Sequence, residues 1–471
     1  MHDFMWDGQN DGRPHNRICL TELQKMVEQS ASGHVIRPGI EIPELIKARK
    51  TRQSSSSTSI HNHVDMSTQT SSNKAALLQK NDNDIVIVSA VRSAITKGKK
   101  GGFKDTKPEL ILSHVLRAAY SKVNLDPKLI QDIAVGNVLP PGGGASAARM
   151  AALHAGIPVE TSINTVNRQC SSGLTAINQI ANQILAGQID IGIGAGVESM
   201  TNGYGAGAAP DVSEEVLENK DAEDCLLPMG ITSENVAKDY GITRRVQDEF
   251  AAKSFQKAAA ANKAGKFKDE IVPITAKFID PKTEKVSEIV VDQDDGIRDG
   301  VTVESLSKLK PAFSKDGSTH AGNASQVSDG AAAVLLARRS VAKRLGLPIV
   351  GKFVTAATVG VPPRIMGVGP AYAIPRVLEI AGITLADVDF FEINEAFASQ
   401  AVFSVQHLNI PFEKVNINGG AIAIGHPLGC TGARQVATGL NIAKQTGKKL
   451  FVTSMCIGSG MGMAAIFVSE Q

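Results

Sequence analysis

The sequence predicts a duplicated α/β fold with an inserted lobe, and three observations indicate this class. Short apolar segments of strand type alternate with helical segments from about residue 84, and the alternation starts again near residue 349. Such alternation is typical of a parallel sheet that is buried on both faces. The second series repeats the order of the first, and residues 202–319 between them are richer in charge. These features predict two related α/β halves, the first of which carries an insertion.

The first 81 residues differ from the rest of the chain, because polar and charged side chains dominate them. Two stretches, 53–59 and 67–73, are rich in serine and threonine and cannot bury enough apolar surface to offset the entropy of ordering. We therefore expect residues 1–81 to form a disordered extension. His61 and His63 could be a metal pair, but no cysteine or carboxylate cluster adjoins them, which favours a solvated loop.

The elements of the first half follow from segment length and apolar spacing. In chain order we predict a strand at 84–90, a helix at 109–123, a strand at 133–138, a helix at 145–155, a helix after residue 170 and a strand at 189–194. We assign residues 82–201, together with 320–346, to this N-terminal half.

The insertion ends where the apolar pattern returns, at residues 327–336. We assign residues 202–319 to an inserted loop domain, with helices near 233–239 and 246–266. Residues 347–471 then form the C-terminal half.

An internal repeat relates the two halves. Asn137 and Asn394 each follow a predicted strand, and they are 257 residues apart. Val166 and Val415 each precede an asparagine, a glycine-containing turn and a helix, and they are 249 residues apart. These similar offsets favour a duplicated fold whose two sheets pack around shared central helices. The alternative is that any two βαβ units look alike.

Composition excludes several classes of function. The chain has 49 basic and 47 acidic residues, a net charge of +2, so it offers no overall field for nucleic acid or a membrane surface. Its five cysteines are odd in number and lack paired spacing, which favours free thiols in a reducing compartment. We find no run of about 18 apolar residues, so we expect no membrane span.

Cys170 stands at the turn around which the chemistry is predicted. The apolar positions after it have helical spacing, so the cysteine lies at a helix N-terminus: they are Leu174, Ile177, Ile180, Ala181, Ile184 and Leu185. Unpaired backbone N–H groups and the helix dipole there favour a thiolate, which predicts a lowered pKa and a nucleophile. The alternative is a small buried cysteine without chemistry, and this stretch alone leaves both open.

Two segments of the C-terminal half could act on the same chemistry. His426 is held between Gly425 and Pro427 just before a helix, and a histidine restrained in this way suits a base for a nearby thiol. Cys456 follows a strand, at the edge where α/β sheets present reactive groups. The glycines after Cys456 allow close backbone approach and can direct N–H groups at a developing oxyanion.

Five motifs together resemble the signature set of the thiolase family. They are NRQCSSGL around Cys170, GNASQVSDGAA from Gly322, NEAF from Asn394, GHPLGCTGARQ from Gly425 and CIGSGMG from Cys456. The similarity is greatest to the peroxisomal 3-ketoacyl-CoA thiolases and covers about residues 84–468. It implies the thiolase fold: duplicated α/β halves in a layered αβαβα arrangement, with a loop domain inserted in the first.

The resemblance also implies a role for each reactive residue. His426 would take the proton of Cys170, and the thiolate would attack the 3-keto carbon of a 3-oxoacyl-CoA. Cys456 would protonate the departing acetyl-CoA enolate and later deprotonate the incoming CoA. One oxyanion hole would consist of His426 and a water held by Asn394, and the other of the backbone N–H groups of Cys170 and Gly458.

Contacts to the substrate are implied in the same way. Arg298, Ser325 and the backbone of Ala321 match positions that contact CoA, although Arg298 could equally be a surface charge. Met229 and Met366 match positions beside the acyl chain, for which core packing is the alternative. Pro228-Met229 replaces the His-Met of short-chain thiolases, and this departure favours a broader or longer acyl range.

The resemblance implies a 3-ketoacyl-CoA thiolase of fatty acid β-oxidation that acts on acyl-CoA and CoA. The alternatives are a biosynthetic acetoacetyl-CoA thiolase and a non-catalytic lipid carrier or scaffold of the same fold, which the intact reactive residues disfavour. CoA would be a substrate, without a metal or redox cofactor, and the chain would form a homodimer. The resemblance places it in the peroxisome. Cytoplasm and mitochondrion are the alternatives, because residues 17–25 only approach the N-terminal peroxisomal signal.

Overall fold

The computed structural model describes residues 73–205 and 212–471. The predictions for residues 1–72, which include the pair His61 and His63, lie outside the described residues. Residues 73–78 are helical, so the prediction that disorder extends to residue 81 is wrong. Leu77 packs against the apolar core of the C-terminal half, and Lys74 Nζ donates to the Asp387 carbonyl at 2.5 Å. These contacts anchor the short helix.

The N-terminal half contains the predicted strands and helices in the predicted order, together with two strands that were not predicted, at residues 96–97 and 162–166. Its elements are β1 (Ile85–Arg92), β2 (Thr96–Lys97), α3 (Pro108–Ser121), β3 (Asp132–Gly136), α4 (Ala145–His154), β4 (Ser162–Val166), α5 (Ser172–Leu185) and β5 (Ile191–Ser199), followed after the insertion by β8 (Ser328–Arg338) and α12 (Arg339–Arg344). Pro108 begins α3 because a proline lacks the N–H that the first helical turn leaves unpaired.

The C-terminal half has the same alternation. Its elements are β9 (Gly351–Gly360), η4 (Pro363–Val368), α13 (Gly369–Ala381), β10 (Phe390–Ile393), α14 (Ala398–His407), α15 (Ala421–Ile424), α16 (Leu428–Thr446), β11 (Leu450–Ile457) and β12 (Met461–Ser469). Helix α16 ends at Gly447, whose φ of +69° is the left-handed conformation that glycine adopts without strain.

The strands form one mixed sheet in the order β10-β11-β12-β9-β1-β8-β5-β3-β4. The predicted all-parallel arrangement is wrong. Strand β3 pairs in parallel with β4 and β5, and β10 with β11, but β8, β1, β9 and β12 pair antiparallel. Strand direction depends on which distant segment becomes the neighbour, and apolar runs alone do not encode that choice.

The pairing pattern shows the predicted duplication. In the first half β3 pairs in parallel with β5, and β5, β8 and β1 then follow antiparallel. In the second half β10, β11, β12 and β9 repeat these relations. Even the outer strand β4 has a counterpart, because Val415 forms an isolated parallel bridge with Phe391 of β10.

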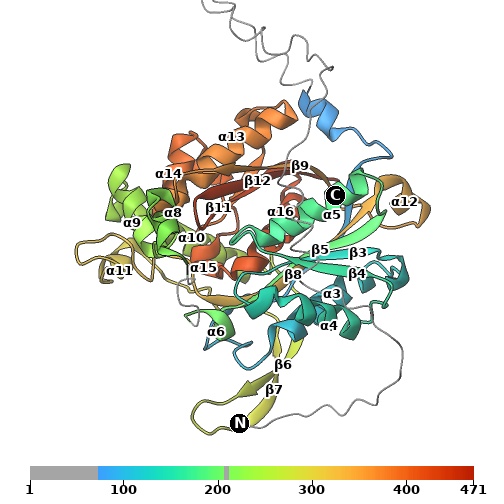
Figure 1. The fold of residues 1–471 in the computed structure, drawn as a ribbon, viewed down its shortest axis with the longest axis horizontal. Helices are drawn as coiled ribbons and strands as arrows, with labels where there is room; N and C mark the ends of the chain where they lie inside the picture. Colours follow the sequence, from blue (N-terminus) through green and yellow to red (C-terminus); the bar gives the residue numbers. More distant parts are fainter. Residues whose placement is uncertain (1–72, 206–211) are drawn as a thin grey trace, which may run out of the picture. The chain divides into compact units, whose positions relative to one another are not determined.

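Five layers result from this arrangement, and Figure 1 shows them in one view. Helices α5 and α16 lie between the two halves of the sheet, with α3 and α4 outside the first half and α13 and α14 outside the second. Separate apolar clusters fill the central layer and the two outer interfaces. The turns before α5 and α16 therefore both open into the middle of the molecule.

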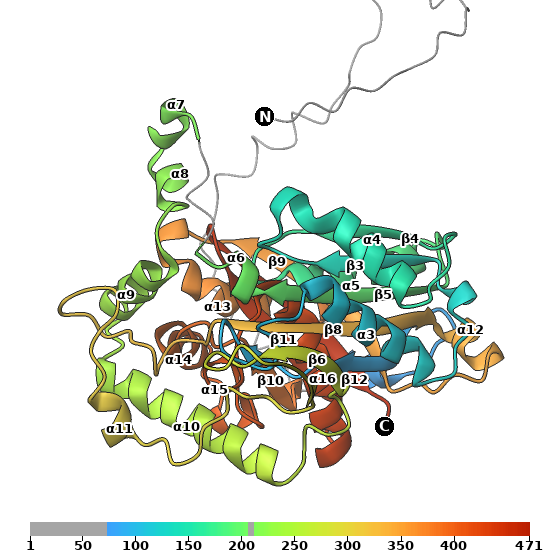
Figure 2. The ribbon, with the colours of Figure 1, turned by 90° about the horizontal axis from the view of Figure 1, so that it is seen from below.

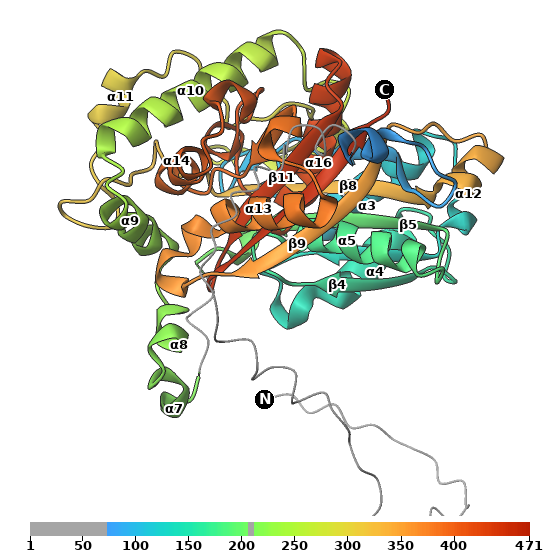
Figure 3. The ribbon, with the colours of Figure 1, turned by 90° about the horizontal axis from the view of Figure 1, so that it is seen from above.

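The insertion consists mainly of helices gathered at one end of this body. They are α6 (Met200–Gly203), α7 (Glu214–Leu217), α8 (Lys220–Asp224), α9 (Met229–Asp239), α10 (Arg244–Lys263) and α11 (Val303–Ser307), with a hairpin of β6 (Ile274–Ile279) and β7 (Val286–Val291). Helices α7 and α8 project from the body (Figure 2), whereas α9, α10 and α11 lie together (Figure 3). The hairpin was not predicted, because most of β7 is exposed and lacks an apolar face.

Within residues 73–205 and 212–471, no helix is both long and apolar enough to cross a membrane. The same residues contain no group of three or more histidine, cysteine, aspartate or glutamate side chains that could hold a metal ion.

Candidate active site

Cys170 lies in a tight turn between β4 and α5. Gln169 before it has a φ of +48°, a left-handed conformation that is uncommon for a residue with a side chain. The turn is closed by backbone hydrogen bonds from Ser171 to Arg168 and from Ser172 to Gln169, both of 3.1 Å. The backbone of this turn therefore fixes where the Cys170 sulfur points.

The resting Cys170 is a thiol, and the predicted lowering of its pKa is wrong. Although part of the residue reaches solvent, its sulfur is deep enough that burial raises the pKa to about 11. The backbone N–H groups of Gly458 and of Cys170 itself oppose this change, and the carboxyl group of Glu198 adds to it. Burial by distant segments outweighs the effect of the helix N-terminus.

The second cysteine faces the first from strand β11. Cys456 is fully buried, which raises its pKa well above the ordinary value, and the negative charge of an ionised Cys170 raises it further. The two sulfur atoms are thus within electrostatic reach of each other. Gly458, two residues on, directs its N–H at the Cys170 sulfur. The N–H groups of Gly458 and Cys170 thus both act on the Cys170 sulfur.

His426 lies in the turn before α16, where Gly425 has a φ of +122°. Its Nδ1 is 2.7 Å from the hydroxyl of Thr431, and that hydroxyl donates to the Pro427 carbonyl at 3.1 Å. Because the hydroxyl proton is used in this way, Nδ1 must be the donor to Thr431, which assigns Nε2 as the unprotonated nitrogen. Thr431 was not predicted, since its role depends on the direction of a single side-chain hydrogen bond.

The His426 imidazole is neutral. The ring is almost completely buried, and burial lowers its pKa to about 3, with a smaller contribution from the positive charge of Arg434. A neutral imidazole with a free Nε2 can accept a proton throughout the physiological pH range. The resting pair of Cys170 and His426 is therefore thiol and imidazole and not an ion pair.

Asn394 lies beside this imidazole at the end of β10. Its backbone N–H donates to the Ser454 carbonyl at 2.8 Å, which ties it to the neighbouring strand β11. The side-chain Nδ2 lies 3.3 Å from His426 Nε2, and Oδ1 has no partner among the described residues. A buried amide oxygen without a partner is a place where a water or a substrate group completes the hydrogen bonding.

Close helix packing brings the turns of Cys170 and His426 together. A Cβ atom added to Gly173, in the first turn of α5, would lie 2.7 Å from the Gly429 carbonyl oxygen in the first turn of α16. One added to Gly432 would lie 2.3 Å from the backbone nitrogen of Leu174. Only glycine allows the two helices to approach this closely, so each reactive turn is placed by the start of a helix that touches the other.

An apolar cluster surrounds Cys456. Met366, Ala396 and Phe397 pack with the cysteine, and the half-buried Met229 and Ala324 border them. Met229 and Met366, the two methionines predicted to contact the acyl chain, thus both lie in the cluster around Cys456.

The three residues predicted to contact CoA lie in different settings. Ser325 is half-buried. Its N–H donates at 2.9 Å to the carbonyl of Ala396, which belongs to the apolar cluster around Cys456. Ala321 is exposed four residues earlier. Arg298 is also exposed, with its guanidinium 4.9 Å from the centre of the Phe255 ring. No hydrogen bond within the described residues joins Arg298 to the reactive groups.

Two further residues at the site were not predicted. Glu198 is buried in β5, where it accepts the N–H groups of Leu139 and Gly429, and burial raises its pKa to about 7. Gln326 donates to the Ile422 and Ala423 carbonyls of α15 at 3.0 and 2.9 Å, and its own carbonyl accepts the His426 N–H at 3.2 Å. Gln326 belongs to a motif that the sequence singles out, but neither its long-range partners nor those of Glu198 can be seen there.

Comparisons with known proteins agree with these observations. The model of the thiolase N-terminal domain matches residues 85–340, and that of the thiolase C-terminal domain matches residues 347–469. The chain is 59% identical over 395 residues to the peroxisomal 3-ketoacyl-CoA thiolase of Yarrowia lipolytica, covering 84% of this chain and 95% of the relative. It is 57% identical over 385 residues to the human peroxisomal 3-ketoacyl-CoA thiolase, covering 82% and 90%. The crystal structure of the dimeric peroxisomal thiolase of Saccharomyces cerevisiae superposes with a TM-score of 0.79 at 54% identity, over 84% of this chain and 100% of that one.

Proposed function

We propose that this chain, which belongs to the thiolase family, is a peroxisomal 3-ketoacyl-CoA thiolase. It cleaves a 3-oxoacyl-CoA with CoA to give acetyl-CoA and an acyl-CoA shortened by two carbons, as in fatty acid β-oxidation. Two observations carry this proposal: Cys170 and Cys456 are within electrostatic reach of each other, and the helix starts next to Cys170 and His426 pack against each other.

The first half-reaction forms an acyl-enzyme. As the Cys170 sulfur attacks the 3-keto carbon, His426 Nε2 accepts its proton. The Cα–Cβ bond then breaks, and its electron pair leaves as the enolate of acetyl-CoA. Cys456 protonates the enolate carbon, a role that fits its raised pKa, because a thiol with a high pKa carries its proton until a stronger base appears. The shortened acyl group remains on Cys170 as a thioester.

The second half-reaction transfers this acyl group to CoA. The Cys456 thiolate takes the proton of the CoA thiol, and the resulting thiolate attacks the thioester carbonyl. Cys170 leaves as a thiolate and regains its proton from His426. Both sulfur atoms and the imidazole thus return to their starting protonation states.

Two oxyanions need stabilisation during these steps. The N–H groups of Cys170 and Gly458 converge on the Cys170 sulfur, which supports their role at the acyl oxygen. The protonated Nε2 of His426 and a water on the unpartnered Oδ1 of Asn394 would hold the enolate oxygen. Because the resting thiol and imidazole are both neutral, these donors must stabilise charge that exists only during the reaction.

We propose that CoA binds against the inserted lobe. Arg298 supplies a positive charge, Ser325 and the Ala321 backbone contact CoA, and Met229 and Met366 border the acyl chain. The chain has three domains in this proposal. Residues 82–201 with 320–346 form the N-terminal half, residues 202–319 form the inserted loop domain, and residues 347–471 form the C-terminal half. The protein acts as a homodimer, and CoA is its substrate without a metal or redox cofactor.

A chain-length assay tests the function. We expect CoA-dependent cleavage of 3-oxoacyl-CoA substrates from C8 to C16, followed by the loss of the 3-oxoacyl absorbance, with Cys170→Ala as the inactive control. Activity on the C4 substrate alone would instead identify an acetoacetyl-CoA thiolase. A wild-type chain without activity on any of these substrates would refute the proposal.

A further inference from the structure

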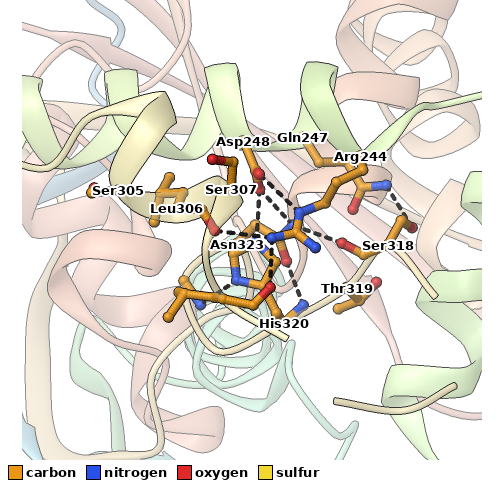
Figure 4. Close-up of polar contacts among 12 residues, drawn as sticks. Arg244, Gln247, Asp248, Ser305, Leu306, Ser307, Ser318, Thr319, His320 and Asn323 are labelled. Atoms are coloured by element: carbon orange, nitrogen blue, oxygen red, sulfur yellow. Dashed lines mark hydrogen bonds and ion pairs between the residues drawn. The ribbon is translucent and has the colours of Figure 1, made fainter. Parts of the chain in front are cut away.

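A buried polar cluster joins the inserted lobe to the segment that leads back into the sheet (Figure 4). We call it the Asp248 hub; its members are Arg244, Asp248, His320 and Asn323. Asp248 belongs to α10, whereas His320 and Asn323 belong to the segment between the lobe and β8. Asp248 is 1% exposed, and His320 and Asn323 are completely buried. The proposed reaction uses none of these side chains.

The carboxylate of Asp248 is the centre of the hub. Its Oδ1 lies 2.7 Å from His320 Nε2 and accepts Asn323 Nδ2 at 3.1 Å, and its Oδ2 accepts Arg244 Nε at 2.8 Å. Burial acts to raise the pKa of Asp248, but the hydrogen bonds from His320 and Arg244 outweigh it and hold the pKa below its ordinary value. Asp248 is therefore a charged, buried acceptor whose two carboxylate oxygens both have donors.

His320 has a single tautomer in this arrangement. The Gly322 N–H donates to Nδ1 at 2.9 Å, so Nδ1 is unprotonated and Nε2 carries the hydrogen that Asp248 accepts. The Asn323 side chain closes the same turn, because its Oδ1 accepts the His320 N–H at 2.8 Å. The side chains thus fix the backbone of residues 320–323 in one shape.

The same turn is joined to the reacting end of β10. The Asn323 carbonyl accepts the Ala398 N–H at 2.8 Å, and Ala324 forms an antiparallel bridge with Phe397. Ala324 and Phe397 both border Cys456. Residues 320–325, which include the proposed CoA contacts Ala321 and Ser325, therefore lie between the hub on one side and the apolar cluster around Cys456 on the other.

We propose that Asp248 and His320 are positioning residues for CoA: they hold residues 320–325 in register with the strand end at Asn394, so that Ala321 and Ser325 meet the CoA chain. This inference rests on the proposed function of those two contacts. Asn394 has its own anchors, through its N–H to Ser454 and through the imidazole of His426. Loss of the hub should therefore weaken CoA binding much more than it slows the chemical steps.

A purely structural hub would behave differently. It would lower the melting temperature and the fraction of active protein, which reduces the apparent kcat without changing the KM for CoA. The ratio of the two kinetic effects separates the roles.

The experiment uses the full chain with Asp248→Asn, His320→Phe and His320→Gln. The phenyl ring keeps the volume of His320 but forms neither hydrogen bond, whereas the glutamine amide can still donate to Asp248. The matched control is Arg245→Ala. Arg245 follows the hub residue Arg244 in α10, and this change removes only its exposed ion pair with Glu249. Steady-state thiolysis at varied CoA gives kcat and KM, calorimetric titration with CoA alone gives Kd, and thermal unfolding gives the melting temperature.

We expect Asp248→Asn and His320→Phe to raise KM and Kd for CoA about tenfold, in line with the loss of a hydrogen bond to a charged group, with kcat changed less than about threefold. His320→Gln should recover part of this loss, and Arg245→Ala should match the wild type. Unchanged KM and Kd in Asp248→Asn and His320→Phe, with only kcat or the melting temperature altered, would overturn the inference. A wild type that binds CoA without turnover would refute the proposed function, and the Kd values of the variants would then decide this inference alone.

Discussion

Two buried histidines, His426 and His320, differ in what faces their second ring nitrogen. In each ring Nδ1 is held by a hydrogen bond to a near neighbour in the chain. At His320 a carboxylate takes the other nitrogen at 2.7 Å, whereas at His426 only the amide of Asn394 approaches it, at 3.3 Å. A saturated imidazole can only hold structure in place. One with an unprotonated nitrogen that lacks a strong partner can accept a proton.

The largest effect is expected when the side chains of His426 and His320 are replaced one at a time. We expect His426→Asn to lower kcat/KM about a thousandfold, because the loss of a general base costs roughly two to four orders of magnitude. His320→Gln should keep kcat within about threefold of the wild type and change only the KM and Kd for CoA. Both are measured by steady-state thiolysis of a C8 substrate. Similar losses of kcat in the two variants would remove the distinction between them.

Much of the architecture and most of this site could be predicted from sequence, because both depend on local patterns. Apolar spacing predicts the helix that follows Cys170, and the glycine and proline around His426 predict a restrained side chain. The repeat of Asn137 by Asn394 reflects equivalent strand ends in the two halves. Each of these signals lies within a short stretch of chain.

The features that were missed or wrong depend on segments that meet only in the folded chain. The pKa of Cys170 is raised and not lowered, because burial in the folded chain outweighs the N–H groups that act on the sulfur. Asp248 and His320 are 72 residues apart in sequence, and nothing local pairs them. The prediction that the strands are all parallel was wrong for the same reason, because each strand's neighbour comes from a distant part of the chain.

A second test uses pH and stability. The folded-state pKa of His426 is about 3, whereas an unfolded histidine has the ordinary value of 6.5. Between these values the unfolded chain binds more protons, so the contribution of the neutral ring is present above pH 6.5 and is lost as the pH falls towards 3. Between pH 7.5 and 5 we expect the wild type to lose about 2 kcal/mol more unfolding free energy than His426→Asn.

Denaturant unfolding of both proteins at the two pH values measures this difference. Parallel changes in the two unfolding free energies would mean that the ring of His426 is not buried in its neutral form.

The smallest expected effect concerns the residue that fixes the tautomer of His426. Thr431→Val removes the hydroxyl that accepts from Nδ1, so the proton is no longer held away from Nε2. We expect kcat to fall about tenfold, the cost of one buried hydrogen bond, with KM for CoA unchanged. Thr438→Val is the matched control, because Thr438 is a buried threonine of the same helix whose hydroxyl donates to Glu270 at 2.9 Å, away from the imidazole. If the control lowered kcat as much as Thr431→Val, the loss would come from a change in helix α16 as a whole. Thr431 would then not be the residue that keeps Nε2 of His426 unprotonated.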